Sequence, residues 1–310
     1  MRRALPILVV LAGLLVAIAA VNPLFLEPPT FLAFVKRAAP LVILAAGQYF
    51  VIVSGEFDLS VGSIVTAEVV IAARLVDGSA EATWPVLVLL IVIGPLVGLV
   101  NGLVTTLLRV PSFITTLGML LILSGAVFLW TGGAPRGALS EQFRELGRGS
   151  AGPVPWSVLI LVALAGLAVA VMRAGFGHTL VATGDNDRAA ALSGVRVARV
   201  RTVAFMISGL SAAVAAVLLG GFAGVSAQVG QGLEFQAITA VVLGGVALGG
   251  GRGSVVAAMA GAFTLEALFT LLNLHGVSGA LEPAVQGVII IAAVALGAVR
   301  LPRRTTAAAT

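Results

Sequence analysis

Residues 85–108 read PVLVLLIVIGPLVGLVNGLVTTLL and contain no charged side chain. A helix that crosses the hydrocarbon layer of a bilayer needs about 20 mostly apolar residues, because only a helix or a closed barrel satisfies its own backbone groups there. Similar runs recur along the chain, in which 59% of the 310 residues are hydrophobic, 10% are charged and the mean hydropathy is +1.14. The sequence therefore predicts a membrane protein rather than a soluble domain.

Apolar runs of this kind divide the chain into about ten predicted spans. No linker separates two domains, so we predict a single transmembrane domain over residues 1–310, all-α and polytopic, with about ten transmembrane helices. The first run follows Arg2 and Arg3 as a secretory signal would, but it is long and lacks a clean cleavage site at Asn22, so it is interpreted as a retained helix. The spans are expected near residues 5–26, 38–54, 60–76, 85–108, 113–131, 155–173, 202–222, 235–248, 254–272 and 280–299.

The positions of the basic residues orient these spans. If the N-terminus lies inside and the chain crosses ten times, most basic residues fall on the inner side, as the positive-inside rule requires. Both termini and the 174–201 loop are therefore predicted to be cytoplasmic, and the 132–154 loop to be periplasmic. The inner residues are Arg2, Arg3, Arg109, Arg173, Arg188, Arg196, Arg199, Arg201, Arg252, Arg300, Arg303 and Arg304. The outer residues are Lys36, Arg37, Arg74, Arg136, Arg144 and Arg148.

Other features of the composition limit the partners and the chemistry. A basic face beside the lipid bilayer accounts for the net charge of +5, so we expect no nucleic-acid partner. Because the chain has no cysteine, it has neither disulfides nor a thiolate metal site, and the inner membrane of a bacterium fits best. His178 and His275 are far apart, and no catalytic arrangement of polar residues is visible. We expect no metal site, no cofactor in this chain and no enzyme activity.

A transporter that accumulates its solute needs an energy source, and this chain carries no ATP site. Its single lysine, Lys36, does not follow a glycine-rich loop, so a phosphate-binding G-x-x-x-x-G-K-[ST] loop is excluded. The glycine cluster at residues 249–253 follows a short eighth span and predicts a tight turn, with a re-entrant hairpin as the alternative. If ATP drives this protein, another chain must bind it.

Two local patterns predict how the spans meet. Three pairs of glycines are spaced four residues apart, which favours close packing of one helix against another: Gly94 with Gly98, Gly220 with Gly224, and Gly245 with Gly249. Arg109 and Pro111 stand at a span boundary, where arginine reaches water and headgroups while proline presets the start of the next helix. Both patterns indicate structural roles.

One polar stretch, GDNDRAAALSGV at residues 184–195, interrupts the apolar sequence. Gly184 is expected to break the preceding structure, Asp185 or Asn186 to cap a helix, and Gly194 to end that helix after about two turns. Its alanines would let a partner surface approach closely, although an ordinary capped loop helix is the alternative. The residues predicted to couple to a partner are Gly184, Asp185, Asn186, Asp187, Arg188, Ala189, Ala190 and Gly194.

Three further segments match, in order, the motifs of one known family. Residues 55–63 read GEFDLSVGS, residues 101–118 contain NG followed by RVPSFITTLG, and residues 231–254 contain AVVLGG and GGRGS. With the polar stretch 184–195, these motifs extend over most of residues 47–278. The chain resembles the permease subunits of bacterial monosaccharide ABC importers of the ribose and xylose type, whose signature reads G-G-I-D-L-S-V-G-S. These belong to the superfamily that also includes branched-chain amino acid permeases.

The resemblance implies an ATP-driven importer in which two permease chains, taken to be identical, form the pore for a monosaccharide. It also implies a solute-binding protein on the outer face and separate ATPase subunits that bind ATP-Mg and contact the polar stretch, which resembles a coupling helix. A branched-chain amino acid, a nucleoside or a furanose-like signal molecule are alternative solutes. Glu56, Phe57 and Arg188 depart from the family pattern, and we expect them to adjust local contacts without changing the fold.

The remaining polar residues in or beside the spans are candidates for the signature site or the transport pathway. Asp58 and Ser60 precede a helix, where Asp58 can fix the turn by accepting backbone N–H bonds, so a structural role is favoured. Glu68 and Glu266 lie inside spans, where an unpaired carboxylate costs about 3 kcal/mol, so both should face the protein interior. They could be cavity groups, neutral packing residues, or the ion sites of a secondary carrier. The candidates are Asp58, Ser60, Glu68, Asn101, Glu266 and Asn273.

Overall fold

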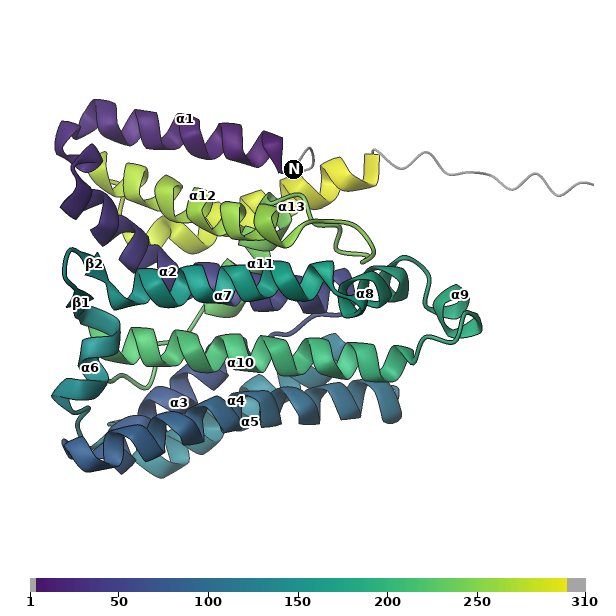
Figure 1. Ribbon diagram of the computed structural model, residues 1–310, viewed down its shortest axis with the longest axis horizontal. Coiled ribbons are helices and arrows are strands. Elements are labelled where there is room, and N and C mark those ends of the chain that lie inside the picture. Colours follow the sequence, from purple (N-terminus) through teal and green to yellow (C-terminus); the bar gives the residue numbers. More distant parts are fainter. Residues whose placement is uncertain (1–3, 300–310) are drawn as a thin grey trace, which may run out of the picture.

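The computed structural model describes residues 4–299, which form thirteen α-helices, two short 3-10 helices and one antiparallel β-hairpin. The long helices form a bundle, and most of them run along its long axis (Figure 1), which confirms the all-α class. The α-helices are α1 Leu5–Val21, α2 Pro28–Val53, α3 Val61–Val76, α4 Ala80–Leu107, α5 Ser112–Thr131, α6 Glu141–Arg148, α7 Trp156–Arg173, α8 Gly175–Asp185, α9 Asp187–Leu192, α10 Val197–Ala223, α11 Leu233–Leu243, α12 Val255–Leu274 and α13 Glu282–Val299. The other elements are η1 Pro23–Leu26, η2 Gly279–Leu281, β1 Ser150–Ala151 and β2 Val154–Pro155.

Six of the described helices are long and apolar enough to cross a bilayer. They are α2, α4, α5, α7, α10 and α12, while α1, α11 and α13 contribute shorter apolar segments. Every one of the ten predicted ranges contains a helix, although several ends differ from the prediction. The structure therefore confirms a polytopic helical protein with six membrane-length helices.

The first two helices differ most clearly from the predicted boundaries. α2 begins at Pro28 rather than at residue 38, because proline is well tolerated at the first position of a helix. Lys36 and Arg37 therefore lie inside a helix and not before it, which corrects the sequence-based boundary. α1 ends at Val21 rather than at residue 26, because the chain turns extended at the following residue and η1 begins at Pro23.

α11 is short, as the sequence predicted. It ends at Leu243 rather than at residue 248, because Gly244 and Gly245 follow and Gly245 adopts φ +78°, which stops a helix. Its 11 residues extend over about 16 Å, roughly half of the hydrocarbon layer. The residues between α11 and α12 form a glycine-rich turn, here called the glycine loop (residues 244–254).

α10 is the central helix of the bundle and packs against α2, α3, α4 and α6. Its contact with α4 depends on glycines: a Cβ atom at Gly94 would overlap the carbonyl oxygen of Gly209, and one at Gly98 would overlap that of Phe205. Glycine alone lets two helix backbones approach this closely. The close packing predicted for Gly94 and Gly98 is confirmed. It is not found for Gly245 with Gly249, nor at Gly224, because nothing described lies within 4 Å of a Cβ atom at these positions.

The two ends of the bundle carry different short elements (Figure 1). One end, here called the α6 end, carries α6 and the β1–β2 hairpin. The opposite end, here called the α9 end, carries α8 and α9. The chain enters α1 and leaves α13 on the side that faces the α9 end (Figure 1). The described chain thus begins and ends on one side of the bundle.

Candidate coupling and signature site

α9 is the helix predicted within the polar stretch 184–195. The Asn186 side chain caps it by accepting a hydrogen bond from the backbone N–H of Ala189 at 2.9 Å. Gly194 follows the helix with φ +86°, a conformation that favours glycine and ends a helix. The cap by Asn186 and the stop at Gly194 are confirmed, and the helix contains six residues.

Gly184 does not break the preceding structure, which corrects that prediction. It lies inside α8, which continues to Asp185. A Cβ atom at Gly184 would overlap the carbonyl oxygen of Val53 at the end of α2, and it would also come close to the backbone of Gly251 in the glycine loop. The glycine is therefore required by close packing and not by a turn.

The surface of α9 is largely free. Ala190 is its one buried residue, 5% exposed, while Leu192 is 91% exposed. Arg188 and Ala189 are also exposed, so these two predicted contact residues remain available to a partner. The prediction is wrong for Ala190, which faces the bundle, and for Gly184, which lies against α2. Leu192 was not among the residues singled out from the sequence, although its apolar side chain on a polar stretch could have identified it.

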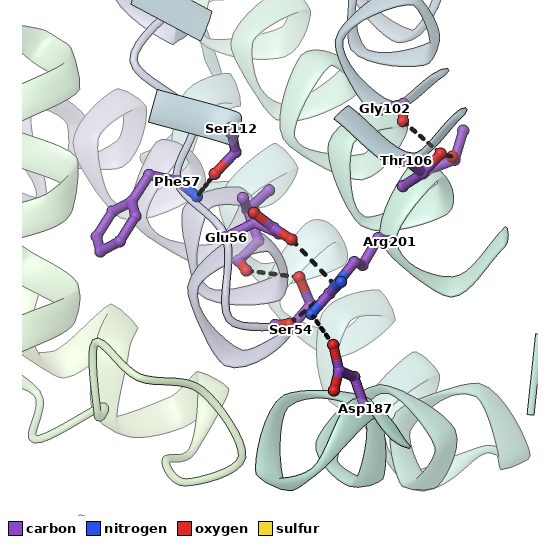
Figure 2. Close-up of polar contacts among 10 residues, drawn as sticks. Ser54, Glu56, Phe57, Gly102, Thr106, Ser112, Asp187 and Arg201 are labelled. Carbon is purple, nitrogen blue, oxygen red and sulfur yellow. Dashed lines mark hydrogen bonds and ion pairs between the residues drawn. The ribbon is translucent and has the colours of Figure 1, made fainter. Parts of the chain in front are cut away.

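Arg201, near the start of α10, connects α9 with the segment that follows α2 (Figure 2). Its guanidinium forms ion pairs with Glu56 at 3.1 Å and with Asp187 at 3.5 Å. Its Nε also donates to the backbone carbonyl of Ser54 at 3.4 Å. Sequence reasoning counted Arg201 only as an inner positive charge and missed this role. Glu56 stands where the family signature has glycine, and this acidic residue could have indicated a basic partner.

The residues between α2 and α3, here called the 54–60 loop, are held by a buried polar network. Asp58 Oδ1 accepts from the backbone N–H of Ser60 at 2.9 Å and from its hydroxyl at 2.6 Å. Asp58 Oδ2 accepts from Ser208 of α10 at 2.8 Å, and Asn101 of α4 donates to the Ser60 hydroxyl at 2.9 Å. All four side chains are fully buried. The backbone contact expected of Asp58 is present, and Ser208 is the member that the sequence did not reveal.

The 54–60 loop also contacts the start of α5 (Figure 2). The backbone N–H of Phe57 donates to the Ser112 hydroxyl at 3.1 Å, and Thr116 donates to the carbonyl of Phe57 at 3.3 Å. Pro111 directly precedes α5, as its predicted structural role requires. Two motifs that are separated in the sequence, 55–63 and 101–118, therefore meet in space.

The glycine loop reaches the same place. The backbone N–H of Gly251 donates to the Val53 carbonyl at 2.9 Å, and Gly250 lies against Gly55 and Gly184. Because these contacts join backbone to backbone, a side chain would separate the segments. Beside them, a cavity of about 420 Å³ at the α9 end is lined by residues that include Glu56, Thr105, Arg109, Asp187 and Arg201.

The remaining predicted pathway residues lie elsewhere and do not form one site. Glu68 is fully buried in α3, and its carboxyl group lies against the backbone of Gly94 in α4. Glu266 of α12 forms an ion pair with Arg37 of α2 at 2.9 Å, so it faces a protein partner as expected. Asn273, near the end of α12, is exposed and lies beside Glu282, whereas Asp58, Ser60 and Asn101 belong to the network described above. A transport role for any of these residues stays a prediction.

A bundle with six membrane-length helices and four ordered motifs gathered at one end defines a multi-pass membrane permease. The sequence profile described as "Branched-chain amino acid transport system / permease component" matches residues 30–294. The chain belongs to this permease family. It is therefore a component of a transport system and a multi-pass protein of the inner membrane.

The alignments with individual relatives cover most of the chain. The ribose import permease protein RbsC of Bacillus subtilis (strain 168) is 34% identical over 292 residues, which cover 91% of this chain and 89% of RbsC. The autoinducer 2 import system permease protein LsrC of Enterobacter sp. (strain 638) is 35% identical, with 92% and 83% of the two chains covered. LsrC of Escherichia coli O9:H4 (strain HS) is 33% identical, with 86% and 79% covered. No solved structure matches the chain.

Proposed function

We propose that this chain is the membrane-spanning permease subunit of an ATP-driven ABC importer, and that it forms part of the pore for a monosaccharide or a similar small polyol. The observation that carries the proposal is the long alignment with a ribose import permease, 34% identical over 91% of the chain. The exposed, capped helix α9 supports the ABC class, because such a helix offers a partner a small rigid surface. The signature motif 55–63 supports a sugar.

The proposal includes a topology. We propose that all of residues 1–310 form one transmembrane domain with about ten crossings. In this topology α1, α3, α11 and α13 add four crossings to those of the six membrane-length helices. The α9 end would face the cytoplasm with both termini, together with the coupling loop 174–201. The α6 end, with the loop 132–154, would face the periplasm. The excess of basic residues assigned to the cytoplasmic side supports this orientation.

The proposed complex contains several other chains. Two permease chains, identical in the simplest case, would enclose the pore, and a solute-binding protein would deliver the sugar. Separate ATPase subunits would bind ATP-Mg and contact α9, because the sequence holds no phosphate-binding loop. The permease would then need no cofactor of its own, and binding of ATP to the ATPases would switch the pore between outward and inward access.

A reconstituted complex tests this proposal. The tagged chain is co-expressed with the ATPase and binding protein encoded beside it, purified, and placed in proteoliposomes. ATP hydrolysis and uptake are then measured with ribose, xylose, autoinducer 2 and leucine. We expect one sugar, added with the binding protein, to stimulate ATP hydrolysis at least fivefold and to accumulate in the vesicles only with ATP.

The same experiment separates the alternatives. Stimulation by autoinducer 2 alone would assign a furanose-like signal molecule, which the LsrC relatives make the second candidate. Stimulation by leucine alone would assign an amino acid. Uptake by the isolated chain along an ion gradient, without ATP, would contradict the importer and favour a secondary carrier. Replacing Ala190 by Arg should displace α9 from the bundle, because this buried position cannot hold a charge. ATP hydrolysis should then be uncoupled from uptake while the protein still inserts into the membrane.

A further inference from the structure

α9 is joined to the bundle by few polar contacts. Within residues 4–299, the only ion pair or side-chain hydrogen bond that links residues 186–194 to another element is the Asp187–Arg201 pair. Apolar anchoring of α9 is also small, because Ala190 is its one buried side chain. A displacement of α9 is therefore transmitted to the bundle mainly through its chain ends and through Arg201.

Two residues of α10, Arg201 and Ser208, hold the 54–60 loop. Arg201 and Ser208 are seven residues apart in α10, nearly two turns, so they lie on one face of the helix about 10 Å apart. Arg201 binds Glu56, and Ser208 binds Asp58, two residues further along the loop. The loop is thereby fixed to α10 at two points, one at the α9 end and one deeper in the bundle.

The 54–60 loop is the place where three helices meet. Its residue Asp58 contacts α10, its residue Phe57 contacts α5, and Ser60 contacts α4. The bonds to α10 and α4 are buried, and the bond to α5 is partly buried. A shift of the loop therefore changes the positions of these helices or breaks bonds that are costly to lose.

We propose that Arg201 is the positioning residue that passes movement of α9 to the 54–60 loop, through its paired contacts with Asp187 and Glu56. The inference rests on the proposed function, since it needs an ATPase that moves α9. The Arg201 and Glu56 side chains are 21% and 14% exposed, so their attraction is screened less than that of a surface pair. Glu56 stands where the family signature has glycine, so the carboxylate that Arg201 binds in this loop departs from that signature.

Neutralising the link tests the inference in the reconstituted complex. In Arg201→Gln, we expect ATP hydrolysis stimulated by the binding protein to stay within twofold of the unmodified complex. Uptake should fall at least tenfold, so that the solute moved per ATP also falls about tenfold. Glu56→Gln should lower this ratio in the same direction. The solute moved per ATP in the double variant should lie within twofold of that in Arg201→Gln, because both residues act in one link.

A matched control and a structural readout separate transmission from damage. Arg199 lies two residues earlier in α10, is exposed, and forms no ion pair among the described residues, so Arg199→Gln should leave the ratio unchanged. The chain has no cysteine, so Phe57→Cys creates a unique thiol in the loop. The rate at which this thiol is alkylated should change at least threefold when the complex is trapped with ATP and vanadate. The change should be absent when Arg201→Gln is added.

Each result has a defined meaning. A ratio of solute to ATP within twofold of the original in Arg201→Gln, in an assembled complex, would overturn the inference and leave the importer intact. An unchanged response of the Phe57→Cys thiol in Arg201→Gln would do the same. A complex that shows no ATP-dependent uptake before any substitution would overturn the proposed function and, with it, this inference.

Discussion

Two short helices, α6 and α9, lie at opposite ends of the bundle and are attached to it in different ways. α6 buries Phe143 completely, and a Cβ atom at its residue Gly147 would overlap the carbonyl oxygen of Leu218 in α10. Two charged residues of α6, Glu141 and Arg148, pair with each other on its exposed side. In α9, by contrast, Ala190 is the one buried residue, and its charged residue Asp187 reaches across to another helix.

This difference shows what each helix is suited to do. Burial of a large aromatic ring holds α6 in one position, because moving it would expose apolar surface and open a cavity. An ion pair of a partly exposed side chain costs little to rearrange, so α9 can be moved while it remains connected. α6 is therefore expected to behave as a fixed cap, and α9 as a movable contact.

The largest effect should come from Phe143→Ala, which removes the anchor of α6. Deleting a buried phenylalanine side chain costs about 3–5 kcal/mol, so the midpoint of thermal unfolding in detergent should fall clearly. Phe128→Ala is the matched control, because Phe128 is 66% exposed, and it should change the midpoint little. Equal losses in the two variants would contradict the view that α6 is held by burial of Phe143.

The next effect should come from Gly184→Ala at the base of α9. The added methyl group would overlap the Val53 carbonyl, so we expect a loss of about 1–3 kcal/mol in the free energy of unfolding. Gly175→Ala in the same helix is the control, since nothing lies within 4 Å of its added Cβ atom. That variant should be neutral or slightly stabilising. If both substitutions are tolerated, the backbone contact between α8 and α2 is not as tight as described.

A smaller effect, confined to partner binding, should follow from Leu192→Ala. Leu192 is 91% exposed, so the unfolding midpoint of the isolated chain should not change. If α9 is the contact for the ATPase, removal of this side chain should weaken ATPase binding about tenfold, because apolar surface is no longer buried in the complex. Unchanged binding, measured by titration of the ATPase onto permease in nanodiscs, would count against α9 as the docking helix.

The smallest effect should come from Glu141→Gln on α6. Its partner is Arg148, and both side chains are largely exposed, so the pair contributes less than about 0.5 kcal/mol. Unfolding midpoint and uptake should both match those of the unmodified chain. A clear loss of uptake would show that the exposed charges of α6 have a function, for example in receiving the binding protein.

Much of the local structure could be predicted from the sequence. Apolar runs located the helices, the side chain of Asn186 and the glycine at 194 defined α9, and Gly94 with Gly98 predicted the contact between α4 and α10. The helix boundaries were predicted less accurately. The charged residues Lys36 and Arg37 interrupt the apolar run, so the sequence predicted a later start, yet α2 begins at Pro28. A charged side chain inside a helix is tolerated where it meets a partner, as Arg37 meets Glu266. Propensity and pattern are local properties, so they report local structure well.

The sequence by itself determined the helical class, the membrane location and the motifs that identify the permease family. The tertiary structure decided which motifs meet. Glu56 lies more than a hundred residues before Arg201, and Asp187 lies on a different helix from Arg201, yet the three form one charged cluster. It also decided that Glu68 and Glu266, which look alike in the sequence, have different surroundings. The physical reason is that such contacts depend on which faces of distant helices pack together, and residue spacing along one chain segment does not contain that information.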